Sequence, residues 1–168
     1  MTGPRLTAVA IVASCVTALS GCEQLSTGEY GPGERRTVRV ERVVDGDTAV
    51  MRIDGRSEYV RYIGIDTPEM NWDDLPESET CAIDATEFNE DRLKAGKKIE
   101  LEFDEELRDR YDRILAYVRV DGRLLNADIL RQGLAETLTI PPNDRYAEDF
   151  SALEREARDR SPDSLPTC

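Results

Sequence analysis

The sequence contains no histidine. A site in this chain must therefore be built from other polar groups, and carboxylates and arginines are the obvious candidates. A zinc site would have to rely on the few cysteines without any help from imidazole, which disfavours this metal. Carboxylates suit a hard cation such as calcium, which prefers oxygen ligands.

Basic residues are also scarce. The chain carries 22 Lys and Arg against 35 Asp and Glu, for a net charge of −13. Such a charge opposes non-specific binding to nucleic acid, because this binding depends on neutralising phosphates. One interpretation is a saline habitat, where acidic surfaces stay soluble and salt screens long-range repulsion. Activity in molar salt would support that hypothesis, and inhibition by moderate salt would contradict it.

Long apolar runs are absent as well. The one apolar segment, residues 6–19, follows Arg5 and is too short to cross a bilayer comfortably. It ends in Leu19-Ser20-Gly21-Cys22, which resembles the lipobox of prokaryotic lipoproteins. The resemblance implies a signal peptide at residues 1–21, a lipidated Cys22 and an exported protein anchored at the cell surface. An ordinary secretory signal cut nearby is the alternative.

Few cysteines would remain in the mature protein. Cys15 would leave with the signal and Cys22 would carry lipid, so Cys81 and Cys168 are left. An even pair in an exported protein suggests a disulfide. Two free thiols are the alternative.

The length of 168 residues predicts one folded domain, and there is no internal repeat. Residues 22–36 are rich in Gly, Ser and Glu and predict a flexible tether, so the folded domain is expected at 37–168. Alternation of apolar and polar residues predicts strands at 38–41, 48–53, 57–65, 98–103 and 114–120. Helices are expected at 82–95, at 126–132 with Asn126 as the cap, and after a cap at Asn143 or Asp144, with 66–80 as a loop.

Five strands and about three helices in this order are typical of an α+β protein, mainly β, built on an OB-type barrel. On the last helix, the spacing places Tyr146, Phe150, Leu153 and Ala157 on one inward face.

Three short strings carry the candidate chemistry: Asp45-Gly46-Asp47-Thr48, Arg61 with Asp66-Thr67-Pro68-Glu69, and Arg110-Tyr111-Asp112-Arg113. Guanidinium groups can grip a phosphate with two hydrogen bonds. Arg61 shares strand parity with Ile63 and Ile65, so it needs either a ligand or a structural ion pair. Each aspartate taken alone would be an ordinary turn residue.

Together these strings resemble the staphylococcal nuclease (thermonuclease) family over roughly residues 38–160. Further landmarks in the same order are residues 97–104, Leu115-Ala116-Tyr117 and residues 131–135. The resemblance implies an OB barrel and calcium-dependent hydrolysis of DNA and RNA to 5′-hydroxyl and 3′-phosphate ends. Single-stranded DNA would be the substrate of a monomeric enzyme.

The resemblance also implies roles for individual residues. Asp47, Asp66 and the Thr67 carbonyl would bind calcium. Arg61 and Arg113 would hold the scissile phosphate, and Glu69 would orient or deprotonate the attacking water. Tyr111 would line the nucleotide pocket. The Cys81 and Cys168 pair also recurs in exported relatives.

Two departures from the family pattern concern substrate binding. The loop at 70–80 is acidic where the family is lysine-rich, and Trp72 in it would either stack on a base or cover the barrel. Residues 138–142 lack the tyrosines that relatives often place there. A non-catalytic OB module that binds single strands or a protein partner is the alternative function. A calcium-binding surface lipoprotein is a third, although it leaves the paired arginines without a purpose.

Overall fold

The structure is a computed structural model that describes residues 30–69 and 76–160. The elements are β1 (Arg35–Val43), β2 (Thr48–Ile53), β3 (Arg56–Tyr62), β4 (Gly64–Asp66), α1 (Pro76–Arg92), β5 (Lys98–Glu102), β6 (Ile114–Val120), β7 (Arg123–Leu124), α2 (Leu125–Gln132), β8 (Glu136–Leu138) and α3 (Ala147–Arg160).

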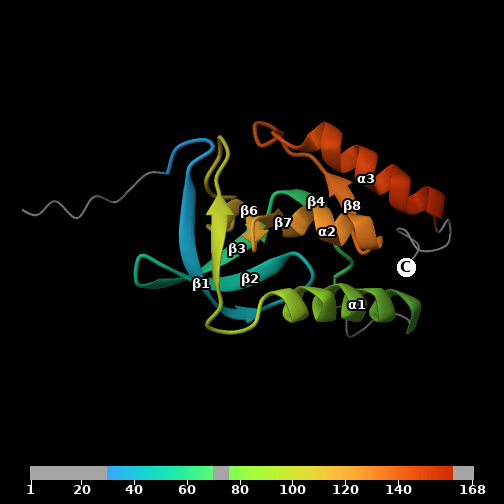
Figure 1. The fold of residues 1–168 in the computed structure, drawn as a ribbon, viewed down its shortest axis with the longest axis horizontal. Helices are drawn as coiled ribbons and strands as arrows, with labels where there is room; N and C mark the ends of the chain where they lie inside the picture. The colour runs from blue at the N-terminus through green and yellow to red at the C-terminus, as the bar shows by residue number, and fades with distance from the viewer. Residues whose placement is uncertain (1–29, 70–75, 161–168) are drawn as a thin grey trace, which may run out of the picture.

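Five of the strands close into a barrel (Figure 1). The antiparallel order β3-β2-β1-β5-β6 is closed by a parallel pairing of β3 with β6, from Val60 opposite Ile114 to Tyr62 opposite Ala116. The short β4 and β8 form a separate two-stranded sheet. The predicted α+β fold with a five-stranded OB-type barrel and three helices is thus confirmed.

Alternate residues of each strand fill the barrel, as the two-residue period requires. On β2, for example, Ala49, Met51 and Ile53 are buried. Helix α2 packs on β6 and α3 packs on α2. On α3, Phe150 and Ala157 are buried, and Tyr146 and Leu153 are half-buried against the core, as the spacing predicted.

The predicted tether is wrong at its C-terminal end. Strand β1 begins at Arg35, and the Tyr30 ring stacks on Phe103 with the ring centres 4.2 Å apart. The Gly33 amide also donates to the Phe103 carbonyl. Residues 30–36 therefore belong to the folded domain, because one aromatic contact and the β1–β5 ladder hold them there.

The strand predicted at 57–65 is two strands. Gly64 has a φ of +83°, and a Cβ there would lie 2.8 Å from the Phe150 ring. The chain turns at this point, so β4 leaves the barrel to pair with β8. The apolar parity of Arg61, Ile63 and Ile65 is therefore not that of one continuous strand.

The starts of α1 and α2 and the residues expected to cap α2 and α3 also differ from prediction. Helix α1 begins at Pro76 inside the expected loop, and proline suits a first helical position because it has no amide hydrogen to leave unpaired. Asn126 lies inside α2, whose N-cap is Leu124. Helix α3 begins at Ala147, so neither Asn143 nor Asp144, the two predicted caps, directly precedes it, and Asn143 instead binds the backbone of Glu106 through both ends of its amide. None of the described helices is long and apolar enough to cross a membrane.

Candidate functional site

The site begins at the tight turn between β1 and β2. The Asp45 carboxylate accepts a hydrogen bond from the Asp47 amide at 3.1 Å, which bends the chain on itself. Helix α1 and the segment after β4 approach this turn closely. A Cβ at Gly46 would lie 2.7 Å from the Ala85 Cβ and 2.8 Å from the Thr67 hydroxyl, so only glycine fits there.

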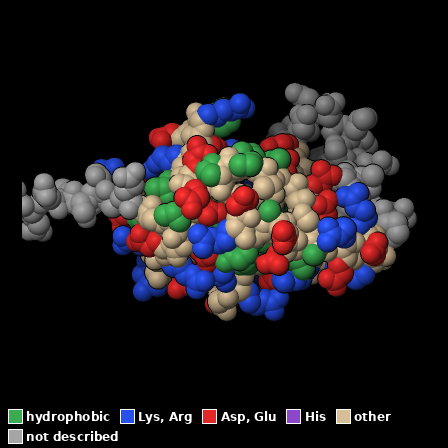
Figure 2. All heavy atoms as spheres, turned by 90° about the horizontal axis from the view of Figure 1, so that it is seen from above, with side chains coloured by type: hydrophobic (Ala, Val, Ile, Leu, Met, Phe, Trp, Pro, Cys, Tyr) green, Lys and Arg blue, Asp and Glu red, His purple; other side chains and the backbone are tan. Residues whose placement is uncertain are grey.

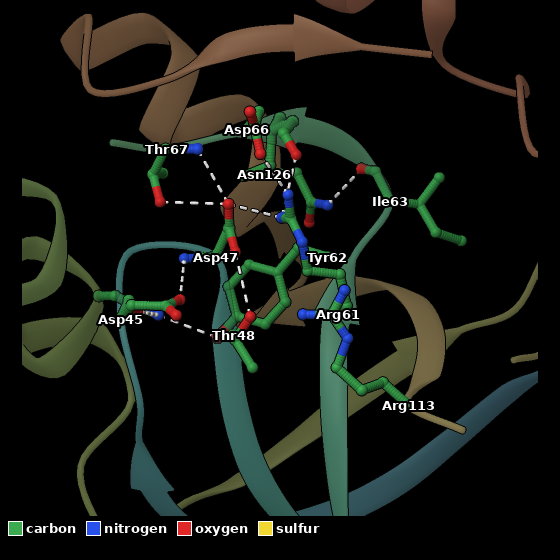
Figure 3. Close-up of polar contacts among 12 residues, drawn as sticks. Asp45, Asp47, Thr48, Arg61, Tyr62, Ile63, Asp66, Thr67, Arg113 and Asn126 are labelled. Carbon is green, nitrogen blue, oxygen red and sulfur yellow. Dashed lines mark hydrogen bonds and ion pairs between the residues drawn. The ribbon is translucent and has the colours of Figure 1, made fainter. Parts of the chain in front are cut away.

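Asp47 is the centre of the cluster (Figure 3). Its side chain is buried, and its Oδ2 accepts hydrogen bonds from the Thr67 amide at 2.9 Å and the Thr67 hydroxyl at 3.1 Å. Its Oδ1 accepts from the Thr48 hydroxyl at 3.1 Å. These bonds join the β1–β2 turn to the segment after β4, which are twenty residues apart in sequence.

Arg61 bridges the two aspartates that sequence reasoning selected as metal ligands. Its Nη1 lies 2.5 Å from Asp47 Oδ2, and its Nη2 lies 2.5 Å from Asp66 Oδ1. Nη1 also donates to the Ile65 carbonyl at 3.1 Å. The guanidinium thus places one positive charge between two converging carboxylates.

The electrostatics of Asp47 are unusual for an ion-paired carboxylate. Burial raises the pKa of Asp47 to about 6, with a further upward contribution from the Asp45 charge. Arg61 and the hydrogen bonds from Thr67 and Thr48 act in the opposite direction and only partly compensate. The folded protein therefore holds this carboxylate at a free-energy cost that an additional positive charge would reduce.

Arg113 is positioned by Asp109 at the start of β6. Its Nε lies 2.7 Å from Asp109 Oδ2, and Asp109 Oδ1 accepts from the Arg113 and Tyr111 amides. Burial acts to raise the pKa of Asp109, but the bonds from Arg113 and the backbone outweigh it and lower that pKa. Neither Nη group of Arg113 makes a hydrogen bond to any described residue. Both remain available to a ligand.

Arg61, Arg113 and Tyr111 line one cavity of about 440 Å³. Tyr111 is 64% exposed. The guanidinium carbon of Arg110 lies 4.7 Å from the centre of its ring, and that of Arg113 lies 5.5 Å from it. The apolar part of the wall includes Leu115, Leu138 and Ile140. The two arginines therefore line a concave pocket with a partly apolar wall, and its volume is in the range of small-molecule sites.

Two buried asparagines hold the site in place, and sequence reasoning missed both roles. Asn89 on α1 donates to the Asp45 carbonyl at 2.7 Å and accepts from the Tyr62 hydroxyl at 3.1 Å. Asn126 on α2 donates to the Ile63 carbonyl and accepts from the Val118 amide, both at 2.9 Å. Each shares a helix face with apolar residues, and this was the available signal, because a buried amide must find partners.

Comparison with known proteins agrees with this geometry. The profile of the family described as staphylococcal nuclease homologue matches residues 59–162, most of the chain. The chain belongs to the staphylococcal nuclease family. It is 34% identical to a thermonuclease of Staphylococcus intermedius, over 94% of this chain and 92% of that protein. It is 29% identical to a thermonuclease of Staphylococcus hyicus with the same coverage, and 35% identical to endonuclease YncB of Bacillus subtilis over 81% of this chain and 65% of that protein.

Membership of the staphylococcal nuclease family implies a divalent cation. Within residues 30–69 and 76–160, no three His, Cys, Asp or Glu side chains are grouped to hold a metal ion. Yet Asp47 and Asp66 converge on one positive charge, and the Thr67 carbonyl belongs to the same segment. The donors are all oxygens, which fits a hard cation, with water and phosphate oxygens completing its coordination.

The remaining predicted site residues are placed less closely. Glu69 is exposed and makes no hydrogen bond or ion pair with any residue of the described part. Cys81 is buried on α1, whereas Cys22 and Cys168 lie outside the described residues, as do Trp72 and residues 70–75 of the acidic loop. Within residues 138–142, where the sequence lacks tyrosine, Leu138 and Ile140 lie on the cavity wall.

Proposed function

We propose that this protein is a calcium-dependent nuclease that hydrolyses phosphodiester bonds of DNA and RNA, leaving 5′-hydroxyl and 3′-phosphate ends. One observation carries the proposal: Arg61 and Arg113 line one cavity while Arg61 also joins Asp47 to Asp66. The site thus has donors for a phosphate beside oxygen ligands for a cation. The printed names of the relatives, thermonuclease and endonuclease, support the same reaction.

The arginines would bind and stabilise the scissile phosphate. Arg113 enters the cavity with both Nη groups unused by the described residues, so it can donate two parallel hydrogen bonds to phosphate oxygens. A guanidinium keeps its charge at every accessible pH, so its stabilisation of the developing negative charge needs no proton transfer. Asp109 keeps Arg113 in this orientation.

Asp47, Asp66 and the Thr67 carbonyl would hold the cation. When bound, a divalent cation neutralises charge that develops on the phosphate. Arg61 is held by the same two carboxylates, so cation binding would release part of its hydrogen-bonding capacity toward the phosphate. Glu69 would orient or deprotonate the attacking water, and Tyr111 would cover the nucleotide.

The protein is further proposed to act outside the cell as a monomer. The segment at 1–21 would direct export, and lipid on Cys22 would tether the domain to the membrane. A disulfide between Cys81 and Cys168 would close the C-terminal part of the chain. Mass spectrometry of the protein from membranes tests these points: a diacylated N-terminal cysteine and a disulfide-linked peptide pair are expected. An unmodified Met1 would contradict export and lipidation, and unlinked Cys81 and Cys168 peptides would contradict the disulfide.

The reaction is tested by incubating the purified protein with single-stranded DNA in calcium or in a chelator. Calcium-dependent cleavage is expected, with loss of about two to three orders of magnitude in Glu69→Ala and Arg113→Ala. The 5′ and 3′ ends of the products are read by mass spectrometry. No cleavage at any salt concentration, with an intact circular dichroism spectrum, would favour the non-catalytic binding module.

A further inference from the structure

The outer face of the barrel continues past Arg61 along β3. In a strand, residues two apart lie on one face, about 7 Å from each other. Tyr59 therefore shares the outer face with Arg61, and it is 48% exposed. The face that carries the arginine of the site also carries an exposed aromatic ring next to it.

The register extends this face across three strands. Tyr59 on β3 lies opposite Val50 on β2, and Val50 lies opposite Arg42 on β1. Arg42 donates to the Tyr59 hydroxyl at 3.1 Å, and its guanidinium lies 5.7 Å from the ring centre. The two side chains thus form an exposed pair on either side of Val50 in the register, and Val50 itself is 6% exposed.

The next row outward contains three cations side by side. Lys98 on β5 lies opposite Arg39 on β1, and Arg39 lies opposite Arg52 on β2. Like charges at directly opposed positions destabilise a sheet. We call Arg42, Tyr59, Lys98, Arg39 and Arg52 the outer-face patch.

Little in the described structure neutralises this patch. Glu41, at the β-bulge of β1, pairs with Arg52 at 2.6 Å. Arg39, Arg42 and Lys98 have no ion pair with any described carboxylate, and Glu100 on β5 is the nearest further acid by register. On the face drawn in Figure 2, acidic and basic side chains are interspersed. In a chain of net charge −13, four cations beside two carboxylates, Glu41 and Glu100, are a local reversal of sign.

We propose that the outer-face patch binds the single-stranded nucleic acid that extends beyond the scissile phosphate. This inference rests on the proposed nuclease function. Cations spaced along a strand face neutralise successive phosphates, and an exposed tyrosine provides a stacking surface for a base. The patch adjoins Arg61 on β3, so one polynucleotide can occupy the site and the patch together. It supplies local affinity that the overall charge of the protein opposes.

The test compares a long and a short substrate. Cleavage of a 20-nucleotide single strand and of a dinucleotide is measured in the purified protein and in Arg39→Gln/Arg42→Gln. The double variant should raise KM for the 20-mer roughly tenfold and flatten the dependence of log affinity on log salt by about 0.7 per lost contact. Cleavage of the dinucleotide should stay unchanged, which also shows that the variant is folded.

The matched control is Arg155→Gln/Arg160→Gln on α3, which packs on α2 and β8 and lies away from strands β1 and β2 (Figure 1). It removes the same charge, and each pair contains one arginine bonded to a backbone carbonyl. Affinity for a labelled 20-mer is also followed by fluorescence anisotropy in chelator, without turnover.

Every outcome of these measurements either supports or overturns the proposal. An equal effect of the two double variants, or an equal effect on both substrates, would overturn the patch, and so would binding of an acidic peptide in place of the 20-mer. Failure of the wild type to cleave either substrate would instead overturn the proposed function. In that case the anisotropy comparison still decides whether the patch binds single strands.

Discussion

Two arginine–carboxylate clusters lie on this barrel, and they differ in one property. Asp47 pairs with Arg61 at the β1–β2 turn, and Glu102 pairs with Arg119 on β5 and β6. Side-chain exposure does not separate the clusters: the two carboxylate side chains are 5% and 3% exposed, and the two arginines are 12% and 13% exposed. By exposure and pairing alone, either could be the functional site.

The carboxylate pKa values separate them. Burial acts to raise the pKa of Glu102, but hydrogen bonds from Tyr146 and Arg119 and the charges of Arg119 and Arg35 lower it overall. For Asp47, burial prevails and the pKa rises to about 6. Glu102 is fully provided with donors by the protein, whereas Asp47 shares its single arginine with Asp66 and has Asp45 beside it. Deeper desolvation of Asp47, together with its fewer positive partners, therefore distinguishes this carboxylate from the structural ion pair at Glu102.

The largest expected effect is on activity at the first cluster. Asp47→Asn removes a proposed charged oxygen ligand of the cation, so cleavage of single-stranded DNA should fall roughly 10³-fold. The metal-free protein should change its unfolding free energy by no more than about 1 kcal/mol, because the variant also relieves the burial of a charge. Rates with calcium and urea unfolding in chelator measure the two quantities. A large loss of metal-free stability would make this cluster structural.

The second cluster should respond in the opposite way. Glu102→Gln leaves Arg119 and Arg35 without their countercharge, so the unfolding free energy should fall by about 3 kcal/mol. Cleavage per folded molecule should remain within a few-fold of the wild type. Urea unfolding measures the loss of stability, and cleavage rates at low temperature, where the variant stays folded, measure the activity. Comparable losses of activity in both variants would remove the contrast between the clusters.

A pH titration sharpens the comparison. Asp47 has a pKa of about 6 when folded and an ordinary value of 3.8, so between these values the folded state binds the extra proton. Metal-free stability should therefore fall as pH rises from about 4 to about 6, by roughly 2–3 kcal/mol from this group. The contribution of Asp47 is isolated by the difference in unfolding free energy between the wild type and Asp47→Asn, measured in chelator across this pH range. A difference independent of pH would refute the raised pKa.

Glu102 should show the reverse slope. Its pKa is lowered from an ordinary value of 4.5, so its contribution is present above that value and is lost as pH falls through the folded pKa. Below pH 5, the unfolding free energies of the wild type and of Glu102→Gln should therefore converge. Divergence on acidification would mean that the carboxylate is not held ionised.

The smallest expected effect is that of one hydroxyl. Tyr146 donates to Glu102 at 2.7 Å and accepts from Arg119 at 2.9 Å. Tyr146→Phe should cost about 1 kcal/mol of unfolding free energy and leave cleavage unchanged. Tyr59→Phe, whose hydroxyl bonds to Arg42 at an exposed position, is the control and should cost less.

Local pattern predicted the regular elements well. Strands β2 and β6 occur at the predicted residues, and α2 begins one residue early. The inward face of α3 is also as predicted, because a helical period depends on residues close in sequence. The break at Gly64 was missed, since it depends on the Phe150 ring from a distant helix.

The candidate site was selected residue by residue, but its connections were not. Asp47, Arg61, Asp66 and Thr67 form one bonded cluster, and Arg113 lines the same cavity as Arg61. For Arg61, the choice between a structural ion pair and a ligand-binding role was open; the structure shows the ion pairs and places Arg61 on the cavity wall, and its ligand-binding role stays a proposal. Burial of Asn89 and Asn126 could have been suspected from their helix faces, but their partners could not be predicted, because each bonds to backbone atoms brought near only by folding.

The sequence by itself determined the period of each strand and helix, the order of the motifs and hence the family. These depend on side chains within one or two turns of each other and on spacing along the chain. Only the tertiary structure decided that Asp47 is buried beside one shared arginine while Glu102 pairs with two, and that Arg42, Tyr59 and Lys98 share one face. Burial, charge balance and register are set by barrel closure, which joins residues far apart in the chain.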